Sequence, residues 1–187
     1  AYYQMKQYDT IFLDRDGTLN PDPGYINDLS QFNFFDFTME GLKILSENGN
    51  RFCIITNQSG VGRGMIEVDK LSEIHDYILN TFHKNDLELL GIYYCPDHPD
   101  KATKFRKPSI GMFLEAAKDH NIEITKCLMM GDALSDIQAG VNLEMDTMLL
   151  LTGRGVDTAD HLGKLRPNYI AENLLDGANL LLEQPSL

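Results

Sequence analysis

Two carboxylates, Asp14 and Asp16, stand two residues apart directly after the apolar run 8–13. If the chain turns at Gly17, both side chains can point at one site, and paired carboxylates of this kind hold hard cations or transfer protons. A polar turn closed by an Asx-type hydrogen bond is the alternative interpretation. A helix-loop-helix calcium site is excluded, because that loop requires a glycine where Leu19 stands.

Three further motifs are weaker when each is taken alone. The segment 131–136, GDALSD, is also typical of a helix start, where Asp is a good N-cap. Lys107 belongs to an Arg-Lys-Pro triplet that would ordinarily lie in a solvated loop, and the segment 56–60, TNQSG, can be a simple turn. Met65 replaces the last glycine of a dinucleotide fingerprint, and the chain has no P-loop motif.

The elements that must position these residues alternate between short apolar runs and segments of helical periodicity. Strands are expected at 8–13, 51–56, 92–95, 127–130 and 147–151. Helices are expected at 38–48, with Thr38 as N-cap and Gly49 as the stop, and at 68–83, 112–120 and 174–182, the last ended by Pro185. This order predicts an α/β fold, a three-layer Rossmann-like parallel sheet that is buried on both faces.

Ligands of such sheets bind beyond the carboxyl ends of the strands. Asp14 follows the first expected strand, Thr56 closes the second and Asp132 follows the fourth. Lys107 lies in the loop before the helix that leads to the fourth strand. Two acids, one hydroxyl and one ammonium are therefore expected at one rim of the sheet.

The 187 residues fit one domain with small loop insertions at about 20–36 and 95–106 and without a large cap domain. The net charge of −12 opposes general binding to nucleic acids or anionic membranes but leaves room for a small phosphorylated ligand in a local basic pocket. Three scattered cysteines favour a reducing cytoplasm over a disulfide framework. No signal peptide is apparent in residues 1–9, and the first residue is not Met, so the true N-terminus stays open.

Taken together, the motifs DxDGT, TNQSG, RKP and GDxxxD, in this order, resemble those of the haloacid dehalogenase superfamily of phosphatases over residues 8–151. Within this superfamily, the chain is similar to the histidinol-phosphate and D,D-heptose 1,7-bisphosphate phosphatase group. The similarity lies in the segments LDRDGTLN, GYI (24–26), TNQSGVGRGM, YYCP and RKPSIGM. The resemblance implies Mg²⁺-dependent hydrolysis of a phosphomonoester through an aspartyl-phosphate. A heptose phosphate, such as D-glycero-D-manno-heptose 1,7-bisphosphate, is the expected substrate.

The resemblance also implies a role for individual residues. Asp14 would be the nucleophile, and Asp16 the general acid and base. Side chains of Asp14 and Asp132, with the Asp16 carbonyl, would hold Mg²⁺. Thr56 and Lys107 would stabilise the phosphoryl group, and Asp136 would hold Lys107 in place. The expected substrate-binding residues are Arg15, Asp22, Gly24, Tyr25, Asn57, Gln58, Ser59 and Arg106.

Two departures from the family pattern stand out. The group often carries a zinc loop of one Cys, one His and two further Cys before the Arg-Lys-Pro triplet. Here Cys95 is kept, but Asp97, Thr103 and Phe105 occupy the other three positions, and His98 is expected to be a surface residue, so no structural zinc is expected. Ala133 follows the metal Asp, where the heptose enzymes tend to have Lys.

Several alternatives stay open. Histidinol phosphate is the main rival substrate, and a polynucleotide 3′-phosphatase shares the TNQ and KPxxGM motifs but conflicts with the acidic charge. A catalytically inactive binding relative is a third interpretation. A receiver-like signalling module would need an acid at the end of the third strand, where Tyr94-Cys95-Pro96 stands. A monomer or small oligomer is expected.

Overall fold

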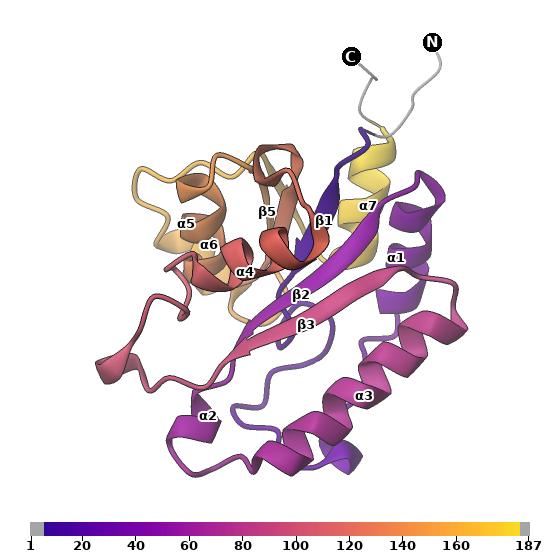
Figure 1. Cartoon of the computed structure of the whole chain (residues 1–187). Helices are drawn as coiled ribbons and strands as arrows, with labels where there is room; N and C mark the ends of the chain where they lie inside the picture. The colour runs from indigo at the N-terminus through magenta and orange to yellow at the C-terminus, as the bar shows by residue number, and fades with distance from the viewer. Residues whose placement is uncertain (1–5, 184–187) are drawn as a thin grey trace.

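The computed structural model describes residues 6–183, whose strands all lie in one parallel sheet (Figure 1). The strand order is β3-β2-β1-β4-β5-β6, and every neighbouring pair is parallel. The strands are β1 (Thr10–Leu13), β2 (Arg51–Asn57), β3 (Leu89–Cys95), β4 (Leu128–Gly131), β5 (Asp146–Leu150) and β6 (Tyr169–Ala171). The predicted parallel α/β fold is confirmed, without a large cap among the described residues.

Helices cover both faces of the sheet because successive strand residues point to opposite sides and both sides are apolar. The helices are α1 (Thr38–Glu47), α2 (Ser59–Gly62), α3 (Val68–Lys84), α4 (Gly111–His120), α5 (Leu134–Asn142), α6 (Gly155–Asp160) and α7 (Leu174–Leu182). Ile11 and Leu13 pack into the cluster formed with α1, α3 and α7, whereas Phe12 packs into the cluster formed with α4 and α5. Short 3₁₀ turns are η1 (Leu29–Gln31), η2 (Pro99–Lys101) and η3 (Ile124–Lys126).

The expected elements are present, with shifts of a few residues at their ends. The prediction that Thr38 is the N-cap of its helix is wrong. Phe37 takes that position, and the buried Thr38 hydroxyl donates a hydrogen bond to the Leu19 carbonyl at 2.8 Å instead. Gly49 follows the end of α1 with φ of +81°, a left-handed conformation that suits glycine. Pro185, the predicted stop of the last helix, lies outside the described residues.

The strand order places β1 between β2 and β4, and this arrangement gathers the predicted residues at one edge. Asp14 follows β1 and Asp132 follows β4, while Thr56 lies near the carboxyl end of β2. Lys107 precedes α4 and reaches the same edge. Within residues 6–183, no helix combines the length and apolar character needed to cross a bilayer.

Candidate active site

A cavity of about 390 Å³ opens at the carboxyl ends of the central strands, within the range of about 300–1,000 Å³ that small-molecule sites occupy. Most of the side chains predicted for the site line this cavity. They are Asp14, Asp16, Asp22, Gly24, Tyr25, Thr56, Asn57, Gln58, Ser59, Arg106, Lys107 and Asp132. Arg15 and Asp136 are not among the lining residues.

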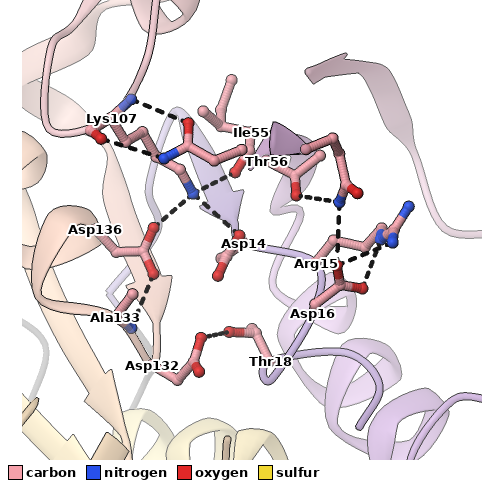
Figure 2. Close-up of polar contacts among 12 residues, drawn as sticks. Asp14, Arg15, Asp16, Thr18, Ile55, Thr56, Lys107, Asp132, Ala133 and Asp136 are labelled. Atoms are coloured by element: carbon pink, nitrogen blue, oxygen red, sulfur yellow. Dashed lines mark hydrogen bonds and ion pairs between the residues drawn. The ribbon is translucent and has the colours of Figure 1, made fainter. Parts of the chain in front are cut away.

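Lys107 is the buried cation at the floor of the cavity (Figure 2). Its Nζ atom donates to Asp136 Oδ1 at 2.6 Å and to Asp14 Oδ1 at 3.0 Å, and also to the carbonyl of Ile55 at 2.7 Å. Burial alone would lower the pKa of Lys107, but the two carboxylates outweigh it and raise that pKa. The ammonium is therefore charged at every pH at which the protein would be assayed.

Three carboxylates converge next to this ammonium. One oxygen from each of Asp14, Asp132 and Asp136 lies within 4.8 Å of the others, and all three residues are buried. Burial and the neighbouring negative charge of Asp14 raise the pKa of both Asp132 and Asp136. Buried carboxylate oxygens that repel one another are a donor set that suits a hard divalent cation. The residues present thus fit Mg²⁺.

The Asp136 carboxylate accepts hydrogen bonds from two groups. Its Oδ1 atom accepts from Lys107, and its Oδ2 atom accepts from the backbone N–H of Ala133 at 3.1 Å, at the start of α5. Gly131 lies against this carboxylate, where a Cβ atom would collide with it. Asp136 therefore lies where it can hold Lys107 in place, the role that the family resemblance implies for it.

Arg15 is not brought to the cavity, so its predicted contact with substrate has no geometric support. The side chain is 0% exposed, and it holds both oxygens of Asp16, with Nε to Oδ1 at 2.8 Å and Nη2 to Oδ2 at 2.9 Å. Its remaining nitrogen, Nη1, lies 3.1 Å from His75 Nε2. Burial and the adjacent guanidinium lower the pKa of His75 to about 3, so the neutral imidazole accepts this hydrogen bond.

Asp16 borders the cavity but faces away from the other acids (Figure 2). Its carboxylate also accepts from Asn20 Nδ2 at 2.9 Å and Gln58 Nε2 at 3.1 Å. Burial would raise the pKa of Asp16, but the charge and hydrogen bonds of Arg15 and the two amide donors outweigh it and lower that pKa. Asp16 is ionised in the free protein at neutral pH.

The segment after Thr56 links the two sides of the site. Gln58 Nε2 donates to Thr56 Oγ1 at 3.0 Å as well as to Asp16. The Asn57 side chain exchanges two hydrogen bonds with the backbone of Lys107, donating to its carbonyl at 3.2 Å and accepting from its N–H at 3.1 Å. Asn57 therefore fixes the loop that carries Lys107, which its sequence position alone does not reveal.

Asp22, Gly24 and Tyr25 also line the cavity. Asp22 accepts a hydrogen bond from the backbone N–H of Gly24 at 3.0 Å, and the Tyr25 side chain lies against Gly60 of α2. Burial, followed by the charges of Asp16 and Asp14, raises the pKa of Asp22. Among the substrate-binding residues predicted from the sequence, these three lie at the cavity as expected.

The segment Thr152-Gly153-Arg154 is one part of the site that sequence reasoning missed. Thr152 Oγ1 donates to the Gly17 carbonyl at 2.6 Å, and the backbone N–H of Arg154 donates to Asp132 Oδ2 at 2.8 Å. Arg154 lines the cavity. The available signal was a polar, glycine-bearing stretch, TGRG, directly after the fifth expected strand.

The loop that replaces the family's zinc site is closed by hydrogen bonds. Asp97 Oδ2 accepts from both the N–H and the hydroxyl of Thr103, at 2.7 and 2.6 Å. Burial raises the pKa of the Cys95 thiol to about 11. Phe105 offers no ligand atom, and these residues do not fit a four-ligand zinc site.

Comparisons with known proteins agree with this geometry. A family model described as HAD-hydrolase-like matches residues 104–177. The D-glycero-beta-D-manno-heptose-1,7-bisphosphate 7-phosphatases of Pasteurella multocida and Haemophilus influenzae are 37% and 35% identical to this chain, and each match covers 91% of this chain and 95% of the relative. The crystal structure of the D,D-heptose 1,7-bisphosphate phosphatase from B. bronchiseptica, complexed with magnesium and phosphate, matches with a TM-score of 0.84 and 28% identity, over 93% of this chain and 98% of that one.

Proposed function

Because this chain belongs to the haloacid dehalogenase-like phosphatases of the D-glycero-D-manno-heptose 1,7-bisphosphate type, we propose that it removes the 7-phosphate of a heptose 1,7-bisphosphate. It is a phosphoric monoester hydrolase, and Mg²⁺ is its cofactor. The observation that carries the proposal is the position of Asp14, which meets Lys107 on one side and Asp132 on the other at the floor of a small-molecule cavity.

In the first step, a carboxylate oxygen of Asp14 attacks phosphorus and forms an aspartyl-phosphate while the bond from phosphorus to the sugar oxygen breaks. Asp16 gives a proton to that leaving oxygen. In the second step water attacks the aspartyl-phosphate, Asp16 takes its proton, and inorganic phosphate and the Asp14 carboxylate are released. Bound Mg²⁺ supplies positive charge that offsets the repulsion between carboxylates and phosphate.

Lys107 and Thr56 stabilise the phosphoryl group in this scheme. The Lys107 ammonium is already fixed by Asp136 and by the Ile55 carbonyl, so no reorganisation is needed when charge builds on the phosphoryl oxygens. The Thr56 hydroxyl lines the cavity beside the nucleophile. Asp136 acts through Lys107 and is a positioning residue.

The acid role of Asp16 requires a change of protonation during the cycle. Arg15 and the amides of Asn20 and Gln58 hold the carboxylate ionised in the free protein. An incoming phosphate dianion favours protonation of a neighbouring acid by like-charge repulsion. Arg15 is accordingly assigned to positioning Asp16, in place of the substrate contact that its sequence position indicated.

Selectivity in this proposal comes from the short loops that border the cavity. Asp22, Gly24 and Tyr25 line the cavity, and so do Ser59 and Arg106. We further propose a single domain that acts in the cytoplasm on a small phosphorylated sugar, as a monomer or small oligomer. The net charge of −12 is the reason for expecting neither nucleic acid nor membrane as a partner.

The test is a substrate screen with Mg²⁺ that measures kcat/KM for heptose 1,7-bisphosphate, heptose 1-phosphate, histidinol phosphate and a 3′-phosphorylated oligonucleotide. We expect the bisphosphate to be preferred and the product to be heptose 1-phosphate. Asp14→Asn, which keeps the shape and removes the nucleophile, should abolish turnover of every substrate with the fold intact. A preference for histidinol phosphate or the oligonucleotide would overturn the substrate. Turnover by Asp14→Asn close to that of the wild type would overturn the mechanism.

A further inference from the structure

Arg154 is the cationic residue at the cavity that no sequence motif indicated, and its backbone is fixed while its side chain is not. The Arg154 N–H is bonded to Asp132, and the preceding Gly153 has φ of +53°. A side chain on Gly153 would collide with the Asp132 carboxylate and with the Cα atom of Gly17. The close approach therefore requires glycine and pins this turn to the catalytic floor.

The other end of the turn is equally well anchored. Thr152 is bonded to the Gly17 carbonyl, and the Thr158 hydroxyl donates to the Asp132 carbonyl at 2.7 Å. The turn thus contacts both the Asp14 loop and the Asp132 loop. Because the backbone cannot shift without disturbing these contacts, the base of the Arg154 side chain has a defined place at the cavity opening.

The guanidinium itself is weakly engaged. The side chain is 72% exposed, and the Asp22 carboxylate is 3.8 Å from Nε, beyond direct hydrogen-bond distance. Lys107, by contrast, is saturated by two carboxylates and a carbonyl. Arg106 uses one nitrogen on the Asp97 carbonyl at 3.2 Å. Arg154 can therefore change partner at little cost.

Charge balance indicates what that partner is. Four aspartates line the cavity, together with four cations, which are Arg63, Arg106, Lys107 and Arg154. A single phosphate at Asp14 is met by Lys107 and Mg²⁺. The lining charges balance, so a substrate with a second phosphate brings two further negative charges that Lys107 does not meet, and these require a guanidinium outside the catalytic floor.

We propose that Arg154 is a specificity-determining residue that binds the non-reacting phosphate of a sugar bisphosphate. Arg154 leaves Asp22 and forms charge-assisted hydrogen bonds to that phosphate, while Asp132 keeps its backbone in place. The inference rests on the proposed function for the identity of the sugar but not for the recognition of a second phosphate. Arg63, which follows α2 on the β2 side of the opening, is the alternative location for that phosphate.

The experiment compares heptose 1,7-bisphosphate with heptose 7-phosphate, which share a leaving group and differ only in the second phosphate. We expect Arg154→Ala to raise KM for the bisphosphate about ten-fold or more, to move KM for the monophosphate much less, and to lower kcat little for either. Arg154→Lys should recover part of the loss. Lys164→Ala, which removes one positive charge from the exposed loop after α6, is the charge-matched control.

An equal rise in KM for both substrates, or no rise for either, would overturn the inference. The inference would also be overturned if KM for the bisphosphate rises selectively in Arg63→Ala but not in Arg154→Ala. A fall in kcat alone would also overturn it, because it would indicate that Arg154 acts on Asp132. If the wild type hydrolyses neither heptose phosphate, the proposed substrate fails, and the inference is then tested by inhibition of p-nitrophenyl phosphate hydrolysis with fructose 1,6-bisphosphate and fructose 6-phosphate. Arg154→Ala must abolish a wild-type preference for the bisphosphate, and the absence of such a preference would overturn the inference.

Discussion

Arg15 and Asp16 are adjacent in the sequence, yet the side chain of Arg15 turns back and holds both carboxylate oxygens of Asp16, at 2.8 and 2.9 Å. The guanidinium is fully buried. Its Cζ atom lies 5.8 Å from the centroid of the Phe32 ring, and its Nη1 atom contacts His75 Nε2. A catalytic acid is thus oriented by its own neighbour in the chain.

Removal of Arg15 should be costly for stability. In Arg15→Met the Asp16 carboxylate loses its buried partner, and we expect the free energy of unfolding to fall by about 3–5 kcal/mol. The matched control is Arg51→Met, because Arg51 pairs with Asp9 at 3.1 Å in a partly exposed position, where a loss of about 1 kcal/mol or less is expected. Urea denaturation measures both. Equal losses in the two variants would contradict the assigned role of the pair.

Asp16→Asn should be most harmful with poor leaving groups. An alkyl phosphate needs a proton on the departing oxygen, and we expect a loss of about 10²–10⁴-fold in the phosphorylation step. p-Nitrophenyl phosphate leaves without protonation and should be slowed much less in that step. Single-turnover kinetics separate this step from hydrolysis of the aspartyl-phosphate. Equal slowing of phosphorylation for both substrates would remove Asp16 from the acid role.

Mg²⁺ should stabilise the folded protein through the carboxylate cluster. At a concentration about 100 times its Kd, a ligand of the native state adds about 2.7 kcal/mol, which for a chain of this size is a Tm rise of roughly 5–10 °C. Asp132→Asn removes one of the three convergent carboxylates and should lose most of this rise. Asp157→Asn, a change at an exposed residue of α6, should keep it. A rise in Asp132→Asn equal to that of the wild type would place the cation elsewhere.

Substitutions of the adjacent cations Lys107 and Arg106 should affect different kinetic parameters. Lys107→Met removes the ammonium next to Asp14, and kcat should fall by about 10²–10³-fold or more. Arg106→Ala should raise KM about ten-fold with a smaller effect on kcat. Lys101→Ala, in the exposed 3₁₀ turn η2, is the control, and circular dichroism checks that each variant is folded. If Arg106→Ala mainly lowers kcat, then the roles of Arg106 in substrate binding and of Lys107 in stabilising the phosphoryl group would have to be exchanged.

Zinc should not be needed by the loop that carries Asp97 and Thr103. Elemental analysis of protein purified without chelator should find far less than one zinc per chain, since the bonds from Thr103 to Asp97 close the loop. Cys95→Ser tests this further, because its activity should stay close to that of the wild type. About one zinc ion per chain, lost in the Cys95 variant, would refute the prediction.

The sequence predicted best the parts of the site that depend on strand ends. Asp14 and Asp132 each follow a continuous apolar run, and parallel strands must bring their carboxyl ends to one edge, so the position of both was accessible from pattern alone. The position of Lys107 at the site could be predicted only from its Arg-Lys-Pro motif, because its ammonium reaches the site from a loop rather than from a strand end.

The parts that were missed depend on contacts distant in the chain. Arg15 was predicted to bind substrate, whereas its side chain is buried against His75, which lies 60 residues away in the sequence, so this burial could not be predicted from the local motif. Strand β6 (Tyr169–Ala171) has only three residues and is specified by its pairing with β5 rather than by its own pattern. The role of Arg154 follows from the docking of its turn on Asp132 and Gly17, which no local spacing reveals.

The strand order also sets when the enzyme becomes active during its synthesis. β1 lies between β2 and β4, and the Thr18 hydroxyl meets Asp132 Oδ1 at 3.3 Å across a separation of 114 residues. A nascent chain that has emerged from the ribosome only as far as α4 carries the nucleophile and the lysine but has no partner for one edge of β1. Late, non-local pairing of this kind is slow. The carboxylate cluster at the site is therefore incomplete until β4 and Asp132 have emerged from the ribosome.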